Sequence, residues 1–464
     1  MRVVSAFAGK LLVGGVLASA AIIACATSSP NPGPIGSTEA PPLPQACNPD
    51  PTCPGSTCAT AITPALAVVP ANACPRFGEF QSDVDVYSWN TFIALNWPAN
   101  PSSCTANTQS SILSGQGPTV WETYPDDLDM FVPPGSKPGA WCSFNTPAAF
   151  ETKLRQRTKL LETGRLQALN TGVHKLLLST SKASAAIGEK LPDIEQAVGG
   201  PLTDQNGRFV RYEKRLNQDE YNYLITNNLW NAAGQKGVTI SFPTGANQSP
   251  GPCNGKPCGP VGAMEVKASW KVLSAQEISG KRFFMRQAWV FNDDAGDPSP
   301  GANPVTVGLV GLHIIHKTDT QQTWFWSTFE HVDNTTSSFF NPHCTGNCTP
   351  NTQTAKEPYT ELAPDGGPLN APVQVTRTTP IQADPGLNAY YRALLKGSVW
   401  ENYQLISTQW ATGGAPQGTP PVLANTTMET YIQSTASCLG CHGQAPKASG
   451  DGSADFSFLL MEAQ

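Results

Sequence analysis

Five residues near the C-terminus constrain this chain more than any other feature: Cys438-Leu439-Gly440-Cys441-His442. With 13 cysteines and 6 histidines among 464 residues, this exact order is expected by chance far less than once. The pattern lies near the C-terminal end of its domain and not at the start, because only residues 443–464 come after it. Whatever these side chains bind must therefore be covered largely by the part of the chain that precedes them.

The order C-x-x-C-H is the attachment signature for c-type haem. In such a site the two thiols bond covalently to the haem vinyl groups, and the histidine ligates the iron. We therefore predict one covalent haem c on Cys438 and Cys441, with His442 as the proximal iron ligand. One alternative is a surface disulfide with an incidental histidine. A zinc knuckle is another, although no second Cys/His pair stands nearby at zinc-finger spacing.

The sequence leaves the opposite iron ligand open. The candidates are His313 and His331, in predicted strands, and Met461, the only methionine after the motif. The other interpretation is that each histidine is a hydrogen-bonded core residue and that Met461 packs the chain end. His313 and His316 point to opposite faces of a strand. If the hairpin pairs about Thr320, His313 shares its face with Ile315, Phe325, Phe329 and His331, and His316 lies with Trp324, Trp326, Thr328 and Glu330.

The N-terminal residues predict export. Arg2 and Lys10 flank the start of an apolar run over residues 11–23, which is short for a membrane span. Residues 1–24 therefore read as a signal peptide. The run ends in Ile22-Ile23-Ala24-Cys25, which resembles a bacterial lipobox with Cys25 as the lipidated residue. The alternative is an ordinary signal peptide cut elsewhere. Residues 25–75 are expected to form a Pro/Ser/Gly-rich tether.

Ten cysteines remain after Cys25, Cys438 and Cys441 are set aside, and an even number suits disulfides in an oxidising compartment. Short loops favour the pairs Cys253–Cys258 and Cys344–Cys348, and Cys104–Cys142 is a further candidate. The connectivity of the remaining four cannot be deduced from sequence; they are Cys47, Cys53, Cys58 and Cys74.

The body of the chain, residues 76–424, is predicted to be a loop-rich α+β fold: a twisted antiparallel sheet with peripheral helices. The abundance of 41 glycines and 42 prolines indicates many turns. Helices are expected at 83–96, 147–169 and 386–396, and strands at 263–273, 282–291, 304–317 and 323–331. The carboxylates at 121–127 and 293–294 are interpreted as solvated turns in preference to calcium ligands.

Residues 425–464 are predicted to be the haem-attachment segment. Thr426 and Glu429 match a capping box that would open a helix running into Cys438. The net charge of -6 provides no basic footprint for nucleic acid. No catalytic residue can be named from the sequence.

The C-x-x-C-H motif resembles that of c-type cytochromes in general. Together with the lipobox, it resembles an exported monohaem cytochrome lipoprotein. The wider pattern resembles large bacterial monohaem proteins of undefined role; it runs from Trp89–Trp97 through Trp324–Asn334 to Asn425–His442. The resemblance implies electron transfer with a redox partner protein. It also implies lipid anchoring in the bacterial envelope, with Ala26 after the cysteine favouring the outer membrane. The alternatives are a haem oxidoreductase, peroxidase- or oxygenase-like, with a substrate pocket in the large domain, and an adhesive body with a redox tail.

Overall fold

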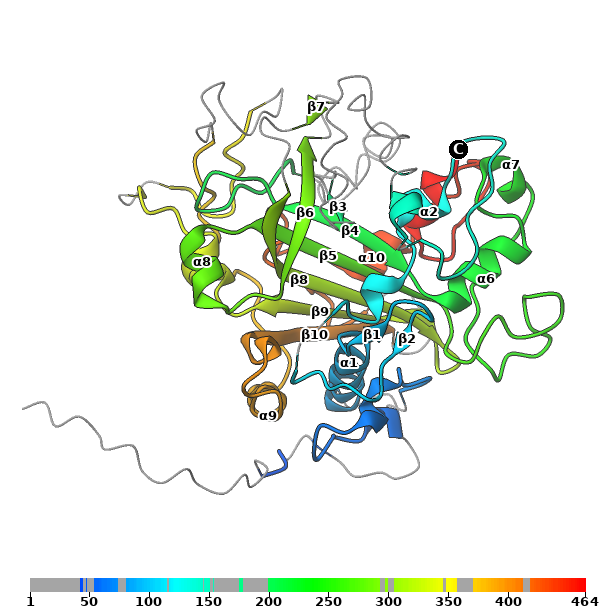
Figure 1. Ribbon diagram of the computed structural model, residues 1–464, viewed down its shortest axis with the longest axis horizontal. Helices are drawn as coiled ribbons and strands as arrows, with labels where there is room; N and C mark the ends of the chain where they lie inside the picture. Colours follow the sequence, from blue (N-terminus) through cyan, green and yellow to red (C-terminus); the bar gives the residue numbers. More distant parts are fainter. Residues whose placement is uncertain are drawn as a thin grey trace, which may run out of the picture. The chain divides into compact units, whose positions relative to one another are not determined.

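A nine-stranded, mainly antiparallel sheet is the centre of the part of the chain that the structure describes (Figure 1). Its main path runs β11-β10-β9-β8-β5-β4. The bounds are β4 Arg211–Leu216, β5 Met264–Val272, β8 Val305–Thr318, β9 Gln321–His331, β10 Tyr403–Ala411 and β11 Gly418–Thr419. Strand β6 (Met285–Asn292) pairs with one end of β8. It also pairs with β7 (Asp297–Pro298) and, in parallel, with β3 (Leu176–Leu177). A separate two-stranded ribbon joins β1 (Ala99–Asn100) and β2 (Thr105–Ala106).

The computed structural model describes residues 42–44, 47, 54–73, 81–114, 117–144, 146–150, 153, 175–177, 199–292, 297–298, 304–344, 348–356, 370–411 and 418–464. The predicted signal peptide, Cys25, Cys53, Cys74, Asp293-Asp294 and most of the predicted helix at 147–169 lie outside these residues. No helix among the described residues is both long and apolar enough to cross a membrane.

Short helices surround the sheet. They are α1 Gln81–Leu95, α2 Asp127–Met130, α6 Gln218–Thr226, α7 Ala232–Gln235, α8 Ala275–Gly280, α9 Pro385–Leu394 and α10 Cys438–His442. Single turns of tighter helix are η1 Pro54–Ser56, η2 Pro64–Ala67, η4 Trp121–Thr123, η8 Val399–Asn402 and η9 Phe458–Glu462, and Asn334–Ser338 form one π-helical turn, η7. The α+β class predicted from sequence is confirmed.

The two faces of the sheet carry different covers, because successive side chains of a strand point to opposite sides. On one face lies α1, which is buried on every side from Asp83 to Leu95. Its Ser88 hydroxyl reaches Ser327 of β9 at 2.6 Å, and Trp89 packs on Phe329. The other face is covered by the C-terminal segment, residues 418–464. Thus α1 packs on one face of the sheet and is buried around its whole circumference.

Hydrogen bonds fix the C-terminal segment to the sheet. Tyr212 donates to the Thr427 carbonyl at 2.7 Å, Asn425 donates to Thr328 at 2.9 Å, and the Thr426 amide donates to Glu330 at 2.6 Å. These contacts come from strands β4 and β9, so the segment lies across several strands. The predicted attachment segment and the body belong to one compact unit, residues 40–464.

The predicted helix that Thr426 was expected to open does not form. Residues 426–435 are a series of turns. Asn425 organises these turns. Its side-chain oxygen accepts a hydrogen bond from the Thr427 backbone amide at 2.9 Å, and its backbone amide donates to the Glu429 carboxylate at 2.8 Å. The Thr426 side chain, predicted to cap, instead donates to Glu330. A helix begins only at Cys438, so the motif forms its own turn and does not end a longer helix.

The β8–β9 hairpin is confirmed, but the expected register is wrong by one residue. Thr318 pairs with Gln321, which leaves Asp319 and Thr320 as a two-residue loop. Beyond a bulge at Trp324, whose φ is +68°, His313 pairs with Thr328. A one-residue slip moves every side chain to the other face. His313 therefore shares its face with Ile315, Trp326, Thr328 and Glu330, and His316 lies on the face of Phe325, Phe329 and His331.

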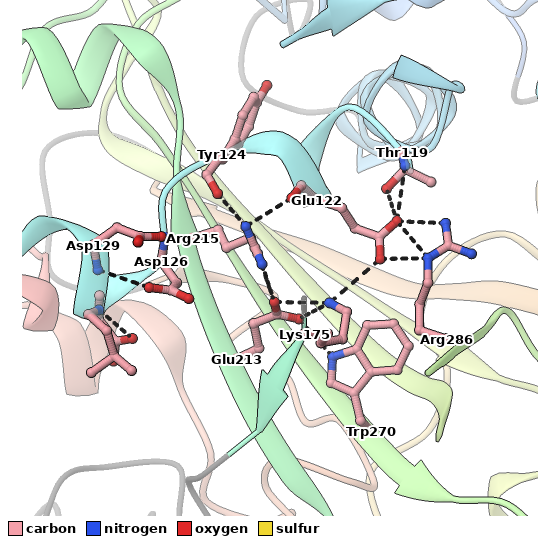
Figure 2. A network of polar contacts seen from close by, with 12 residues as sticks. Thr119, Glu122, Tyr124, Asp126, Asp129, Lys175, Glu213, Arg215, Trp270 and Arg286 are labelled. Carbon is pink, nitrogen blue, oxygen red and sulfur yellow. Dashed lines mark hydrogen bonds and ion pairs between the residues drawn. The ribbon is translucent and has the colours of Figure 1, made fainter. Parts of the chain in front are cut away.

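The carboxylates at 121–127 are not solvated turns, and this expectation is also wrong. Figure 2 shows Glu122 pointing at Arg286, with Glu213 between Lys175 and Arg215. The two glutamates are buried, with Glu122 only 7% exposed, and Arg286 is half-buried. Burial alone would raise the pKa of Glu122, but Arg286 and Lys175 lower that pKa to about 2. The network pins the η4 loop to β4 and β6.

Disulfides join Cys104–Cys142, Cys253–Cys258 and Cys344–Cys348 as predicted, and Cys47–Cys58 is an additional pair. The Cys47–Cys58 pair bears on the predicted tether, 25–75. Residues 54–73 within that range form η1 and η2, and Cys58 and Ala67 lie in the core beneath α1. This part of the expected tether belongs to the folded unit.

Candidate functional site

The predicted attachment residues lie together on α10, a single helical turn. Ser437 caps it by accepting the Gly440 amide at 3.2 Å. Leu439, only 1% exposed, packs into the core, and its amide donates to the Gln409 side chain of β10 at 2.9 Å. Cys438 and Cys441 are thiols at half-exposed positions. Because they are three residues apart in a helix, they share one side of the turn.

His442 is held in a fixed orientation. Its ring is buried, and Nδ1 lies 2.8 Å from the carbonyl oxygen of Phe456. The ring centroid of Trp326 lies 4.4 Å from that of His442, and the ring of Phe458 lies 5.0 Å away, edge-on. Since a carbonyl oxygen can only accept, Nδ1 is the donor and the lone pair of the ring belongs to Nε2. Histidines that bind metals in proteins commonly donate their other ring nitrogen to a carbonyl oxygen in this way.

The carbonyl that orients His442 comes from a strained turn. Asp455 and Phe456 have φ values of +50° and +74°, a region that side-chain-bearing residues enter rarely. Three contacts hold the turn: Phe242 and Lys317 both donate to the Asp455 carboxylate, at 2.7 and 2.5 Å, and Trp324 donates to the Asp455 carbonyl at 3.1 Å. Strain at such a turn persists only where surrounding structure fixes it.

A pocket lies beside α10, between the C-terminal segment and the sheet. Its volume is about 450 Å³ with its open mouth included. The sheet and the C-terminal segment both contribute to its lining: Lys267, His313, Ile315, Trp326, Leu423, Glu429, Ile432, Ala436, Ser437, Cys438, Cys441 and His442.

Of the three candidates for the opposite iron ligand, His313 alone is among the described residues that line this pocket. Its Nε2 lies 3.4 Å from the Glu429 carboxylate, and both side chains are buried. Lys267 is its cross-strand neighbour on β5. The corrected register is what brings His313 to the α10 side of the sheet, on the same face as Trp326.

His331 and Met461 lie elsewhere. His331 is on the α1 face of the sheet, stacked on Phe283 with ring centroids 4.1 Å apart, and its Nε2 contacts the Arg282 carbonyl at 3.1 Å. Burial lowers the pKa of His331 to about 4. Met461 lies in η9 and is partly buried. His316 is on the α1 face too, bonded to Tyr87, and burial likewise lowers its pKa to about 4.

Sequence reasoning missed several residues of the site. Glu429 was taken for a capping residue, and its carboxylate does accept a backbone amide, but it also faces His313. Lys267, Gln409 and Phe456 carried no motif at all. With the correct register of β5 on β8, the alternation of side chains along the two strands would have placed Lys267 next to His313. The Phe456 carbonyl has no sequence signal.

The side chains fit a covalently held haem. Two thiols on one face of a turn, followed by an imidazole whose Nδ1 is engaged by a carbonyl, are the donor set that a c-type haem uses. No family model, curated protein or solved structure matches the chain.

Proposed function

We propose that this chain carries one haem c on Cys438 and Cys441, with His442 as the proximal iron ligand, and transfers single electrons in the bacterial envelope. The observation that carries the proposal is the bond from His442 Nδ1 to the Phe456 carbonyl. That bond directs Nε2 for metal binding within the same turn that presents the two thiols. The motif itself supplies the identity of the cofactor.

The residues of the chain would each do a separate job. The thiols of Cys438 and Cys441 would form the thioether bonds, and Trp326 and Phe458 would pack the ring of His442. We place His313 opposite His442, because it is the pocket residue with an iron-binding nitrogen and Glu429 orients it. When bound, the haem supplies an iron that gains and loses one electron.

The location and partners rest on the sequence. Lipidation of Cys25 would anchor the protein, at the outer membrane, and a second redox protein would donate or accept the electron. A Cys25→Ser variant tests the anchor: we expect loss of the lipid mass and release from the membrane fraction. Unchanged mass and membrane association would contradict it. We propose no nucleic-acid partner.

A haem oxidoreductase is the second candidate, and one observation favours it. His313 and Glu429 form a buried imidazole–carboxylate pair in the pocket. If the iron kept an open position, this pair would be placed for acid–base chemistry on a small ligand such as peroxide. The two functions differ in the state of the iron: six-coordinate and unreactive for electron transfer, open to ligands for an oxidoreductase.

The test is to express the full chain with a cytochrome c maturation system and to look for haem after denaturation. We expect a haem-stained band in the wild type and its loss in the Cys438→Ser/Cys441→Ser double variant. The matched control is Cys253→Ser/Cys258→Ser, which removes two cysteines from a loop disulfide and should keep the haem. Covalent haem in the first variant would overturn the proposal. Binding of carbon monoxide by the wild type would favour the second candidate.

A further inference from the structure

Two buried glutamates lie where the first turn of α6 meets β5, and the proposed electron transfer gives them no role. Glu220 is in the first turn of α6 and is fully buried, and Glu265 is on β5 at 8% exposure. Among the described residues, neither oxygen of Glu220 nor Oε1 of Glu265 has a hydrogen-bond donor. Glu220 could have reached back to the Asn217 amide, but that amide donates to the Met264 carbonyl.

The two carboxyl groups face each other. Asn217, which caps α6, exchanges hydrogen bonds with Met264, the residue before Glu265, and this brings the first turn of α6 with Glu220 beside Glu265. Burial, then the charges of Glu265 and Asp455, raise the pKa of Glu220 well above its usual value. Burial also raises the pKa of Glu265, against opposing contributions from Ser457, Lys267 and Lys214. Two carboxyl groups buried side by side do not readily ionise together, so the pair binds a proton more tightly than separate carboxylates would.

The charged groups around the pair come from every element packed against it. Lys214 of β4 is engaged by Asp127 and Glu462, and Lys267 of β5 lines the haem pocket. On the C-terminal side, Asp455 is neutralised by Lys317. No cation among these bonds directly to Glu220. Since no salt bridge fixes the charge of Glu220, a change of charge nearby can alter how tightly the pair binds a proton.

Two routes join this pair to the proposed iron ligand. Ser457 bonds to Glu265 and directly follows Phe456, whose carbonyl holds His442. Across the sheet, Glu265 pairs with Ile315 and Ile315 pairs with Trp326, the residue packed on His442. Two strand spacings of ~4.8 Å separate Glu265 from Trp326 by about 10 Å. His442 lies a further 4.4 Å beyond Trp326, and through an effective dielectric constant of about 20 a unit charge about 15 Å away changes proton affinity by a factor on the order of ten.

We propose that Glu220 and Glu265 are a proton-binding site coupled to the oxidation state of the iron, so that the protein takes up a proton as it accepts an electron. This rests on the proposed function. A one-electron reductant, in the cell a redox protein, reduces the ferric iron to ferrous. The added negative charge strengthens proton binding, and a carboxylate of the pair takes a proton from solvent. Oxidation releases the electron to the acceptor and the proton to water.

The experiment is a spectroelectrochemical titration of the full, haem-loaded chain at a series of pH values. In the wild type we expect the midpoint potential to fall as pH rises, by about 60 mV across the titration of the pair, the equivalent of a tenfold change in proton affinity. Glu220→Gln and Glu265→Gln should each remove this dependence. The control Glu401→Gln, at a carboxylate bonded to the Gly397 amide, should retain it.

Infrared difference spectra of the oxidised and reduced protein give a second readout that needs no variant. We expect a protonated-carboxyl band that grows on reduction. The same pH dependence in the wild type and both glutamate variants, or no carboxyl band on reduction, would overturn this inference while leaving haem attachment intact. Absence of covalent haem would overturn the proposed function, and this inference with it.

Discussion

Nδ1 of His442 lies 2.8 Å from the carbonyl oxygen of Phe456, a residue whose backbone φ is +74°. The ring of the proposed iron ligand is therefore fixed by the polypeptide before any cofactor is attached. The turn that supplies the carbonyl is held by Asp455, which accepts hydrogen bonds from Phe242 and Lys317 on other elements. The tail that follows the C-x-x-C-H motif thus positions His442, although the tail itself contains no motif.

This contact predicts the tautomer of His442 in the protein without haem. We expect the proton on Nδ1, because the facing carbonyl cannot donate. Nitrogen-15 NMR of the apo chain, with His442 assigned through a His442→Gln variant, measures which ring nitrogen carries the hydrogen. Protonation at Nε2 alone would contradict the orientation. The Asp455→Ala variant should loosen the turn and broaden or shift the same signal.

The placement of His313 opposite His442 predicts a change of spin state. In the haem-loaded chain we expect His313→Ala to convert a low-spin, six-coordinate spectrum to a high-spin one that binds carbon monoxide. Glu429→Gln, which keeps the size but not the charge, should weaken the low-spin signal less. The controls are His331→Ala and Met461→Ala, the other two candidates. If either of these changes the spin state and His313→Ala does not, the assignment is wrong.

Close packing of the C-terminal segment on the sheet predicts the effect of a single methyl group. A Cβ at Gly311 of β8 would lie 2.5 Å from Thr427 Oγ1 and 2.6 Å from Ser269 Oγ. These two hydroxyls are bonded to each other and cannot both withdraw. Gly311→Ala should therefore lower the free energy of unfolding by ~1–3 kcal/mol, measured by urea titration of the apo chain. Gly280→Ala, with open space around its Cβ, is the matched control and should be neutral or slightly stabilising.

Much of the fold could be predicted from local patterns. Alternating apolar residues identified the strands that became β5, β6, β8 and β9, because a half-buried strand repeats every two residues. The register of the hairpin could not be predicted in this way. The local sequence has no strong signal that decides between a two-residue loop and a turn centred on Thr320. That single residue decided whether His313 or His316 faces α10. Long-range contacts set it, among them the Gln321 bond to the Ala411 carbonyl of β10.

The residues of the site likewise fall into those that the sequence predicts and those that only the fold reveals. Cys438, Cys441 and His442 are adjacent in sequence and could be recognised together. Glu429 lies over 100 residues from its partner His313, and the carboxylates of residues 121–127 are buried by basic residues from distant segments. Composition suggests that such carboxylates are solvated, and only the fold reveals that Arg286 and Lys175 surround Glu122.

Burial of Asp85 in α1 predicts stability that falls as pH rises. Desolvation, partly offset by hydrogen bonds from Gln81 and Thr408, raises the pKa of Asp85 from 3.8 to about 7. Because the folded pKa is the higher one, the folded state binds the proton more tightly, and stability is lost between about pH 4 and 7. Asp85→Asn mimics the neutral acid. It should gain stability relative to wild type over this window, by on the order of 4 kcal/mol in full.

Denaturant titrations of the apo chain at pH 5 and pH 8 measure this difference. The gain of Asp85→Asn over wild type should be larger at pH 8. Equal differences at the two pH values would mean that the carboxyl is already ionised in the fold at low pH.

Glu122 predicts the opposite pH dependence. Burial would raise its pKa, but Arg286 and Lys175 hold that pKa at about 2, below the ordinary 4.5. With the folded pKa lowered, the stabilisation is complete above about pH 4.5 and is lost as pH falls toward 2. Glu122→Gln removes the carboxylate from half-buried Arg286 and leaves Lys175 with Glu213 alone, so it should cost ~1–3 kcal/mol at pH 7. The deficit relative to wild type should shrink in acid, because the unfolded wild-type chain then binds a proton at Glu122 that folding must release. Urea titrations at pH 7 and pH 3 measure both values, and a deficit that stays constant between them would show that the charge of Glu122 is not what holds the η4 loop to the sheet.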